Sequence, residues 1–165
     1  MPDIKKTTRV CFTGHRSIDK AHANQLNDLL GKAIDKMIQD GVTVFRNGGA
    51  VGFDTLAALK VIEKKKANKN IRLELFLPCK NQAEKWNAFS KEIYAYILSE
   101  ADAISYSAES YTPYCMHARD KAMVEGSGCC IAYCLRSSGG SAFTLEYAYK
   151  HGLRIINLAG SLLAE

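Results

Sequence analysis

The sequence lacks long hydrophobic runs, paired metal-binding cysteines and low-complexity segments, and each absence excludes a class of protein. No apolar run reaches the roughly 18 residues that a membrane-spanning helix needs. Residues 1–6 lead into a strand pattern and not into a signal peptide. The six cysteines include no C-x-x-C pair, and four lie in or beside apolar runs, where a thiol acts as a small hydrophobe. We therefore expect a soluble, cytoplasmic protein with reduced thiols, no membrane partner, and neither a metal ion nor another cofactor.

The net charge of +5 is concentrated in one short segment. Residues 60–72 contain six lysines and arginines and a single acid, Glu63, so the charges of the remaining chain sum to zero. Such a segment suits a solvated helix end whose lysines face the negative end of the helix dipole. The alternative is a contact with a nucleic-acid backbone. Because aromatic residues do not alternate with these lysines, we expect no nucleic-acid partner.

Apolar runs that suit strands alternate with stretches of helical spacing along the chain. Strands are predicted at residues 9–12, 42–46, 71–77, 103–106, 129–134 and 153–158, and helices at 19–39, 54–66, 82–99, 114–124 and 141–151. Such an alternation predicts parallel pairing, with helices on both faces of the sheet. The chain has 165 residues, 47% of them hydrophobic, and no linker. We predict a single Rossmann-like three-layer α/β domain, residues 1–165, with a mostly parallel central sheet and helices on both faces.

Two glycine-rich turns each lie between a predicted strand and a predicted helix. The first glycine turn spans residues 46–54, the second spans 137–141, and the first strand ends in a third turn at 13–16. Glycines let a ligand approach the backbone closely, and a helix that begins just after them presents free N–H groups and a positive dipole end. Ligands of parallel α/β sheets bind beyond the carboxyl ends of the strands, where these turns lie. We therefore predict a cleft that holds an anion, above all a phosphate group.

The predicted ligand-binding residues come from these three turns and from the helix after the second glycine turn. They are Gly14, His15, Arg16, Asn47, Gly48, Gly49, Ala50, Gly52, Asp54, Gly139, Gly140, Ser141 and Thr144. Asp54 has an alternative role as a cap at the N-terminus of its helix. Loop packing is an equal alternative for His15 and Arg16.

A nicotinamide-dependent Rossmann enzyme is disfavoured by the same turns. The first glycine turn reads G-G-A-x-G and not G-x-G-x-x-G, and it follows the second strand instead of the first. No acid stands at the end of the next strand to bind a ribose, because Glu74 lies in mid-strand and Leu77-Pro78-Cys79 closes it. The phosphate-binding prediction stays, whereas hydride transfer is not expected.

Five motifs follow one another along nearly the whole chain. They are Thr13-Gly14-His15-Arg16, the segment 48–58, Leu77-Pro78-Cys79 with Gln82 and Trp86, the segment 116–124 and the segment 139–144. In this order they resemble the YpsA-like branch of the SLOG superfamily, which groups the DNA-processing protein DprA with the cytokinin-activating LOG phosphoribohydrolases. The resemblance implies a Rossmann-like fold in a bacterial, cytoplasmic protein.

The LOG enzymes offer the most detailed comparison. Their motif M-H-x-R-K and their later loop P-G-G-x-G-T-x-x-E resemble the segments 116–120 and 138–146 of this chain. By this resemblance, Arg119 and Glu146 are the candidate catalytic residues for N-glycosidic cleavage of a nucleoside monophosphate. A carboxylate can stabilise an oxocarbenium-like ribosyl centre or activate water, and a guanidinium can hold the phosphate or the leaving group.

The chain also departs from the LOG pattern. The departures are Ser138 for the proline, Ala142 for the later glycine, Phe143 for the threonine and Asp120 for the lysine after the arginine. A plainer role for Arg119 is an ion pair with Asp120 or Glu125 on a helix surface. Glu146 is, on the same view, a solvated helix residue.

Three functions from different classes remain open. The first is binding of a nucleotide or nucleotide-derived small molecule between the two glycine turns, in a sensor or regulatory protein. The second is a LOG-like phosphoribohydrolase that uses Glu146 and Arg119. The third is a DprA-like DNA-binding role, since Ala50-x-Gly52-x-Asp54 also resembles that protein. LOG relatives form dimers, so a homodimer is a further expectation by analogy.

Overall fold

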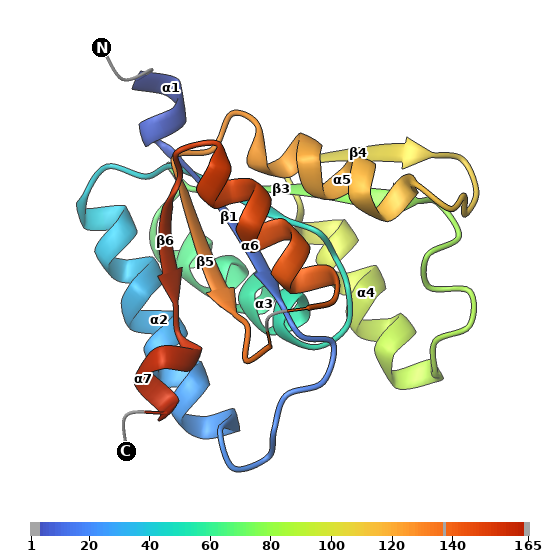
Figure 1. Ribbon diagram of the computed structural model, residues 1–165, viewed down its shortest axis with the longest axis horizontal. Coiled ribbons are helices and arrows are strands. Elements are labelled where there is room, and N and C mark those ends of the chain that lie inside the picture. Colours follow the sequence, from blue (N-terminus) through green and yellow to red (C-terminus); the bar gives the residue numbers. More distant parts are fainter. Residues whose placement is uncertain (1–3, 137, 164–165) are drawn as a thin grey trace.

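The computed structural model describes residues 4–136 and 138–163, so Ser137 of the second glycine turn lies outside the described residues. Strands and helices alternate along the chain (Figure 1). The strands are β1 (Arg9–Gly14), β2 (Val44–Asn47), β3 (Arg72–Cys79), β4 (Ala103–Ala108), β5 (Cys129–Tyr133) and β6 (Arg154–Asn157). The helices are α1 (Ile4–Thr7), α2 (Ala23–Gln39), α3 (Phe53–Ala67), α4 (Ala88–Glu100), α5 (Cys115–Val124), α6 (Gly140–Lys150) and α7 (Ala159–Leu163).

The strands form a six-stranded sheet in the order β4-β3-β2-β1-β5-β6, and every pair of neighbours runs parallel. The chain adds strands outward from β1 to β4 and then returns to the other side of β1 with β5. Strand order therefore reverses between β1 and β5, which is where parallel α/β sheets bind their ligands. The predicted Rossmann-like α/β fold is confirmed.

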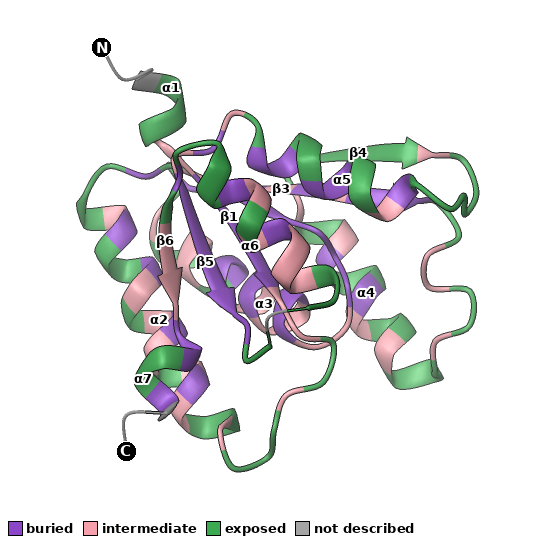
Figure 2. Cartoon of the chain, in the orientation of Figure 1, coloured by how far each residue is buried: buried purple, intermediate pink, exposed green. Residues whose placement is uncertain are grey.

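Helices cover both faces of the sheet (Figure 1). Because side chains alternate between the two faces of a strand, β1 contributes to two cores. Val10 and Phe12 pack in the larger core with residues of α2, α3, α4 and α7. Cys11 packs in the smaller core with residues of α5 and α6. Figure 2 shows that β5 is buried along its length whereas the edge strand β4 is mostly exposed.

Two helices begin several residues later than the sequence predicts, and the two short helices α1 and α7 were not predicted. α2 begins at Ala23 instead of residue 19, and α4 begins at Ala88 instead of residue 82. Residues 81–86 form turns, and the Asn87 side chain accepts the backbone N–H of Ser90 at 2.7 Å, which starts α4. The short helix α1 lies where the sequence predicted no helix. Apolar spacing therefore predicted both helices to start too early, because it does not reveal the turns that precede them.

The basic segment 60–72 lies at the end of α3 and the start of β3. Three of its lysines form ion pairs, Lys60 with Glu63 at 3.5 Å, Lys64 with Asp35 at 2.9 Å and Lys65 with Asp102 at 2.7 Å. Lys65 also donates to the carbonyl oxygen of Glu100 at the end of α4. These contacts join α3 to α2 and to the residues before β4, and they leave the three lysine side chains only partly exposed.

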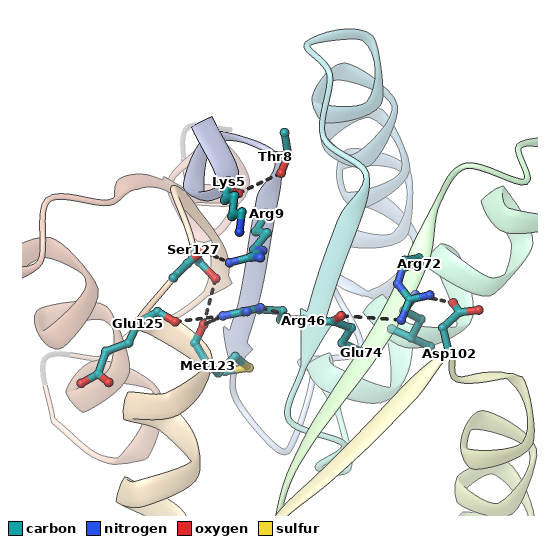
Figure 3. A network of polar contacts seen from close by, with 12 residues as sticks. Lys5, Thr8, Arg9, Arg46, Arg72, Glu74, Asp102, Met123, Glu125 and Ser127 are labelled. Atoms are coloured by element: carbon teal, nitrogen blue, oxygen red, sulfur yellow. Dashed lines mark hydrogen bonds and ion pairs between the residues drawn. The ribbon is translucent and has the colours of Figure 1, made fainter. Parts of the chain in front are cut away.

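Arg46 of β2 connects the sheet to the end of α5 (Figure 3). Its Nη1 donates to the carbonyl oxygens of Glu125 at 2.9 Å and Met123 at 3.3 Å. Its Nε lies 3.5 Å from Oε1 of Glu74 on β3, and the guanidinium lies over the ring of Phe76. Arg46 thus satisfies carbonyl groups that the helix end leaves free. This contact fixes the position of α5, which carries several residues of the site described next.

Candidate functional site

A cleft of about 640 Å³ opens beyond the carboxyl ends of β1 and β5, at the point where strand order reverses. Its walls come from these two strand ends, the first glycine turn, α5 and the start of α6. Ten of the predicted residues line it, namely Gly14, His15, Arg16, Ala50, Asp54, Arg119, Gly139, Gly140, Ser141 and Thr144. The structure places five others outside the lining, namely Asn47, Gly48, Gly49, Gly52 and Glu146. The cleft also contains residues that the sequence did not single out as ligands, and Met116, Asp120 and Arg136 are among them.

The first glycine turn packs between the cleft and the protein interior. Asn47 is fully buried, and its side chain donates to the carbonyl oxygen of Asp54 and accepts the N–H of Gly49, both at 2.8 Å. Gly49 has φ +68°, and a Cβ there would lie 2.5 Å from Cδ2 of Leu77 in the core. The Gln82 side chain donates to its carbonyl oxygen at 3.1 Å. Gly49 therefore faces the protein interior, and it is required for packing of the turn.

Gly52 has a similar supporting role beneath the loop that follows β1. Its φ is +82°, and an added Cβ would overlap the backbone of His15 and Arg16. The N–H of Phe53 donates to the carbonyl oxygen of His15 at 3.0 Å. The glycine thus lets the start of α3 approach the β1 loop closely. This close approach holds His15 and Arg16 at the cleft.

Arg119 of α5 lies in the cleft lining, and its side chain is held on several sides. Nε donates to Oδ1 of Asp120 at 2.6 Å, and Nη1 donates to the carbonyl oxygen of Gly48 at 2.5 Å. Nη2 contacts the sulfur of Met116 at 3.6 Å. With 6% of its surface exposed, Arg119 is a buried residue. The ion pair with Asp120 therefore lies inside the protein and not on a helix surface.

Asp54 is the most perturbed acid of the site. Burial raises the pKa of Asp54 to about 6, against the opposing effects of Arg119 and of the Ala50 N–H, while nearby Asp120 raises it further. Oδ2 accepts the Ala50 N–H at 3.2 Å. Oδ1 is buried and has no hydrogen-bond partner in the described part of the chain. Gly52 is the N-cap of α3, so Asp54 does not cap the helix but closes the glycine turn.

His15 connects the ends of β1 and β5 with the second glycine turn. Its Nε2 accepts the N–H of Leu135 at 2.7 Å, and its Nδ1 lies 3.3 Å from Oγ of Ser141. Burial, together with the positive charge of Arg136, lowers the pKa of His15. A ring nitrogen that accepts an N–H carries no proton, so the imidazole is neutral and presents its Nδ1–H to Ser141.

The start of α6 gives the cleft a positive wall. Gly139 and Gly140 line the cleft, and α6 runs from Gly140 to Lys150. The first backbone N–H groups of a helix have no partner within it and carry the positive end of the dipole. Arg16 and Arg136 line the same cleft and are exposed. Three sources of positive potential thus meet there, and an anion is the ligand that they favour.

A column of stacked rings runs along α6 beside the cleft. His117 of α5 stacks on Phe143 with ring centroids 4.0 Å apart, Phe143 on Tyr147 at 6.3 Å, and Tyr147 on His151 at 4.0 Å. His117 is the member that lines the cleft. The spacing of residues 143, 147 and 151 on one helix face is visible in the sequence. The pairing with His117 depends on the packing of α5 against α6.

Glu146 lies outside the cleft. Its side chain is 67% exposed and pairs with Lys150 at 3.0 Å, one turn further along α6. The buried residues of this helix are Thr144 and Ala148, which lie on one face because they are four residues apart. Glu146 lies between them in sequence and so points away from that face. The structure therefore does not bring Glu146 and Arg119 together.

The described residues hold no cluster of metal ligands, no disulfide bond and no membrane-spanning helix. Within residues 4–136 and 138–163, His, Cys, Asp and Glu form no group of three that could hold a metal ion. All six cysteines are buried and free of disulfide bonds. None of the helices in the same ranges combines the length and apolar character needed to span a membrane.

A six-stranded parallel sheet with alternating helices, whose strand order reverses beside a cleft, defines a Rossmann-like fold. The model of the YspA SLOG family matches residues 10–155, and the chain belongs to this family. It is 27% identical over 126 residues to a UPF0398 protein of Bacillus cereus strain G9842, covering 74% of this chain and 68% of the relative.

Solved structures share the fold at low sequence identity. DNA processing protein A from Helicobacter pylori, solved in a study of its single-stranded DNA binding mode, has a TM-score of 0.64 and 16% identity, covering 98% of this chain and 75% of that one. DprA from Streptococcus pneumoniae has a TM-score of 0.55 and 14% identity, and the match covers 95% of this chain and 61% of that one. At such low sequence identities, these similarities show a shared fold and nothing further.

Proposed function

We propose that the cleft binds a nucleotide or nucleotide-derived small molecule, with its phosphate at the N-terminus of α6, and that the protein is a sensor or regulator. The observation that carries this proposal is the meeting of Arg16, Arg136 and the first turn of α6 in one cleft. A phosphate group accepts hydrogen bonds from backbone N–H groups and from guanidinium groups, and all of these are present. Membership of the SLOG family supports a nucleotide-type ligand.

The size and variety of the cleft suit a nucleotide better than a free phosphate ion. Its volume of about 640 Å³ falls within the range of about 300–1,000 Å³ that small-molecule sites occupy. The cleft also offers a stacked imidazole, His117, and the buried carboxylates of Asp54 and Asp120. These groups serve a base and a sugar, whereas an inorganic anion needs neither.

Binding is proposed ahead of cleavage because the two residues implicated by the LOG resemblance are separated. Arg119 lines the cleft, but its Nε and Nη1 already donate to Asp120 and to Gly48. Glu146 is exposed and paired with Lys150. A water or a ribosyl centre held in the cleft therefore has no contact with Glu146 in this conformation.

A thermal-shift panel of AMP, ADP, ATP, ADP-ribose, NAD and cyclic nucleotides tests the proposal. At a concentration about 100-fold above the Kd, binding stabilises the fold by about 2.7 kcal/mol, which raises the Tm by roughly 5–10 °C. No shift from any member at millimolar concentration would contradict it. A shift with single-stranded DNA alone would favour the DprA-like role.

A matched pair of variants locates the phosphate. A Cβ added at Gly140 would meet no atom within 4 Å, so Gly140→Asp adds a carboxylate to the first turn of α6 without a clash. We expect this variant to fold and to lose nucleotide binding through charge repulsion. Gly160→Asp adds the same charge at an open position of α7, outside the cleft lining, and should bind as the wild type does. Equal loss in both variants would argue against a phosphate at α6.

A further inference from the structure

The acidic part of the cleft has an unusual composition, with two carboxylates beside a single guanidinium. Asp54, Arg119 and Asp120 are 7%, 6% and 8% exposed and all line the cleft. They come from α3 and α5, so they meet only in the folded chain. Ionised together, they leave an excess negative charge in a buried place, which is costly unless another group compensates it.

The protein does not use the hydrogen-bonding capacity of this group fully. Arg119 forms its ion pair with Asp120 and sends Nη1 to the carbonyl of Gly48, so Asp54 has no ion pair with it among the described residues. Asp54 accepts one backbone N–H, on Oδ2. Its Oδ1 is a buried acceptor without a donor in the described part of the chain. Most buried polar groups are paired, so an unpaired acceptor in a cleft lining indicates a missing ligand donor.

We propose that Asp54, with Asp120 beside it, binds the ribose hydroxyls of the ligand and makes the site selective for ribonucleotides over 2′-deoxyribonucleotides. This inference rests on the proposed function, because it places the sugar next to a phosphate held at α6. A carboxylate accepts short, strong hydrogen bonds from hydroxyl groups. In dinucleotide-binding sheets of this architecture, an acid accepts the hydrogen bond of a ribose hydroxyl.

Charge decides against the other candidate donors. A phosphate is repelled by two carboxylates, so the ligand cannot bind in the reverse orientation. A cationic group would meet the positive charge of Arg119, which pairs with Asp120 and also acts on Asp54. A neutral hydroxyl meets neither obstacle. The sequence contains no acid at the end of β3 that could bind a ribose. In this proposal, Asp54 of α3 and Asp120 of α5 take that role, from the two faces of the sheet.

The experiment measures the affinity of three matched pairs, AMP and dAMP, GMP and dGMP, and ATP and dATP, by isothermal titration calorimetry. Wild type should bind each ribonucleotide about 10- to 100-fold more tightly than its 2′-deoxy partner, because hydrogen bonds to charged groups contribute about 1.5–3 kcal/mol. Asp54→Asn should reduce that ratio to below about threefold while leaving the affinity for the 2′-deoxy nucleotides within a factor of three. Asp28→Asn, an exposed substitution of the same kind on α2, should keep the wild-type ratio.

Each outcome has a distinct meaning. Equal binding of ribo and 2′-deoxy nucleotides by wild type would overturn the ribose assignment and leave the nucleotide cleft standing. A ratio that persists in Asp54→Asn and also in Asp120→Asn would place the hydroxyls elsewhere and overturn it too. No binding of either series would overturn the proposed function itself. Should Asp54→Asn fail to fold, Asp120→Asn is the deciding variant, because Asp120 is the second buried carboxylate of the same cleft lining.

Discussion

The Nε2 atom of His15 accepts the backbone N–H of Leu135 at 2.7 Å, and this bond joins the end of β1 to the residues that follow β5. The two strands are neighbours in the sheet, and strand order reverses between them. Protonation of Nε2 would turn the acceptor into a donor facing another donor. The geometry of the switch point therefore depends on a neutral imidazole.

The first prediction is that acid weakens this connection. The pKa of His15 is lowered by burial and by Arg136, so the folded state holds the proton less tightly than the unfolded state. Its contribution to stability is full above pH 6.5 and is lost as the pH falls through the folded pKa. An NMR titration of the His15 ring should have its midpoint below 6.5. A midpoint at or above 6.5 would contradict the neutral assignment, and a His15→Ala variant identifies the signal.

The second prediction concerns the stability cost of Asp54. The pKa of Asp54 is raised to about 6, so the folded state binds its proton more tightly than the unfolded state does. Ionisation of Asp54 therefore lowers the free energy of unfolding. This loss is small near pH 4 and grows as the pH rises to 6, whereas His15 destabilises the fold as the pH falls. Asp54→Asn should increase the free energy of unfolding by up to about 2–3 kcal/mol above pH 7. Urea denaturation at pH 5 and pH 8 measures it, and a gain that is equal at both values would refute the ionisation account.

The third prediction separates glycines that support the fold from glycines that face the ligand. Gly49→Ala forces a side chain into a positive-φ position 2.5 Å from Leu77, and it should cost about 1–3 kcal/mol of stability. Gly140→Ala enters open space and should change stability by no more than about 1 kcal/mol. Chemical denaturation of both variants is sufficient. Equal losses would show that the second glycine turn is packed as tightly as the first.

The fourth prediction tests the Arg46 contact shown in Figure 3. Arg46→Met removes the donor of two carbonyls at the end of α5 and leaves Glu74 without its partner across the strands. Arg46 is buried and Glu74 is partly buried, so the unpaired acceptors that the substitution leaves should cost about 1–3 kcal/mol. The double variant Arg46→Met with Glu74→Gln should recover part of that loss. If the double variant is as unstable as the sum of both single variants, the pair is not coupled.

The fifth prediction addresses catalysis. Glu146 is exposed, and its ion pair with Lys150 is of the surface i, i+4 type, so Glu146→Gln should change stability by no more than about 0.5 kcal/mol. Nucleotide affinity should stay within a factor of two. Wild type should release no adenine from AMP over hours at micromolar concentration. Robust release that disappears in Glu146→Gln would restore the phosphoribohydrolase alternative.

Sequence patterns were sufficient for the order of elements and for the end of the sheet that carries the cleft. Alternating apolar and helical segments define the parallel sheet, and glycine turns at strand ends mark its ligand edge. Patterns were insufficient for the direction in which each glycine faces. Gly49 and Gly140 belong to similar turns, yet only the packing of Leu77 against the first decides that it faces the core.

The remaining differences have local physical causes. Glu146 occupies the position expected from the resemblance, but helical geometry places the buried face at Thr144 and Ala148, so the carboxylate points to solvent. The ion pair of Arg119 with Asp120 was one of the predicted roles of this arginine, but it was expected on a helix surface and the structure places it inside the protein. The acidic group forms in the cleft lining, where the start of α3 and helix α5, from opposite faces of the sheet, each contribute side chains. The hydrophobic periodicity of a single segment cannot predict that residues so distant in the sequence meet in the folded chain.

The unequal packing of the two glycine turns bears on how this family can change over generations. Substitutions in the first turn meet Leu77, Arg16 or Arg119 and endanger the fold before they alter what is bound. A side chain at Gly140 meets no neighbouring atom, so substitutions there can reshape the ligand wall in a protein that still folds, whereas Gly139, with φ +102°, strains any other residue. Selection can therefore change the wall at the start of α6 with little loss of stability, but it can hardly change the first glycine turn. Relatives with the same sheet can acquire different ligands by drift in the second turn alone.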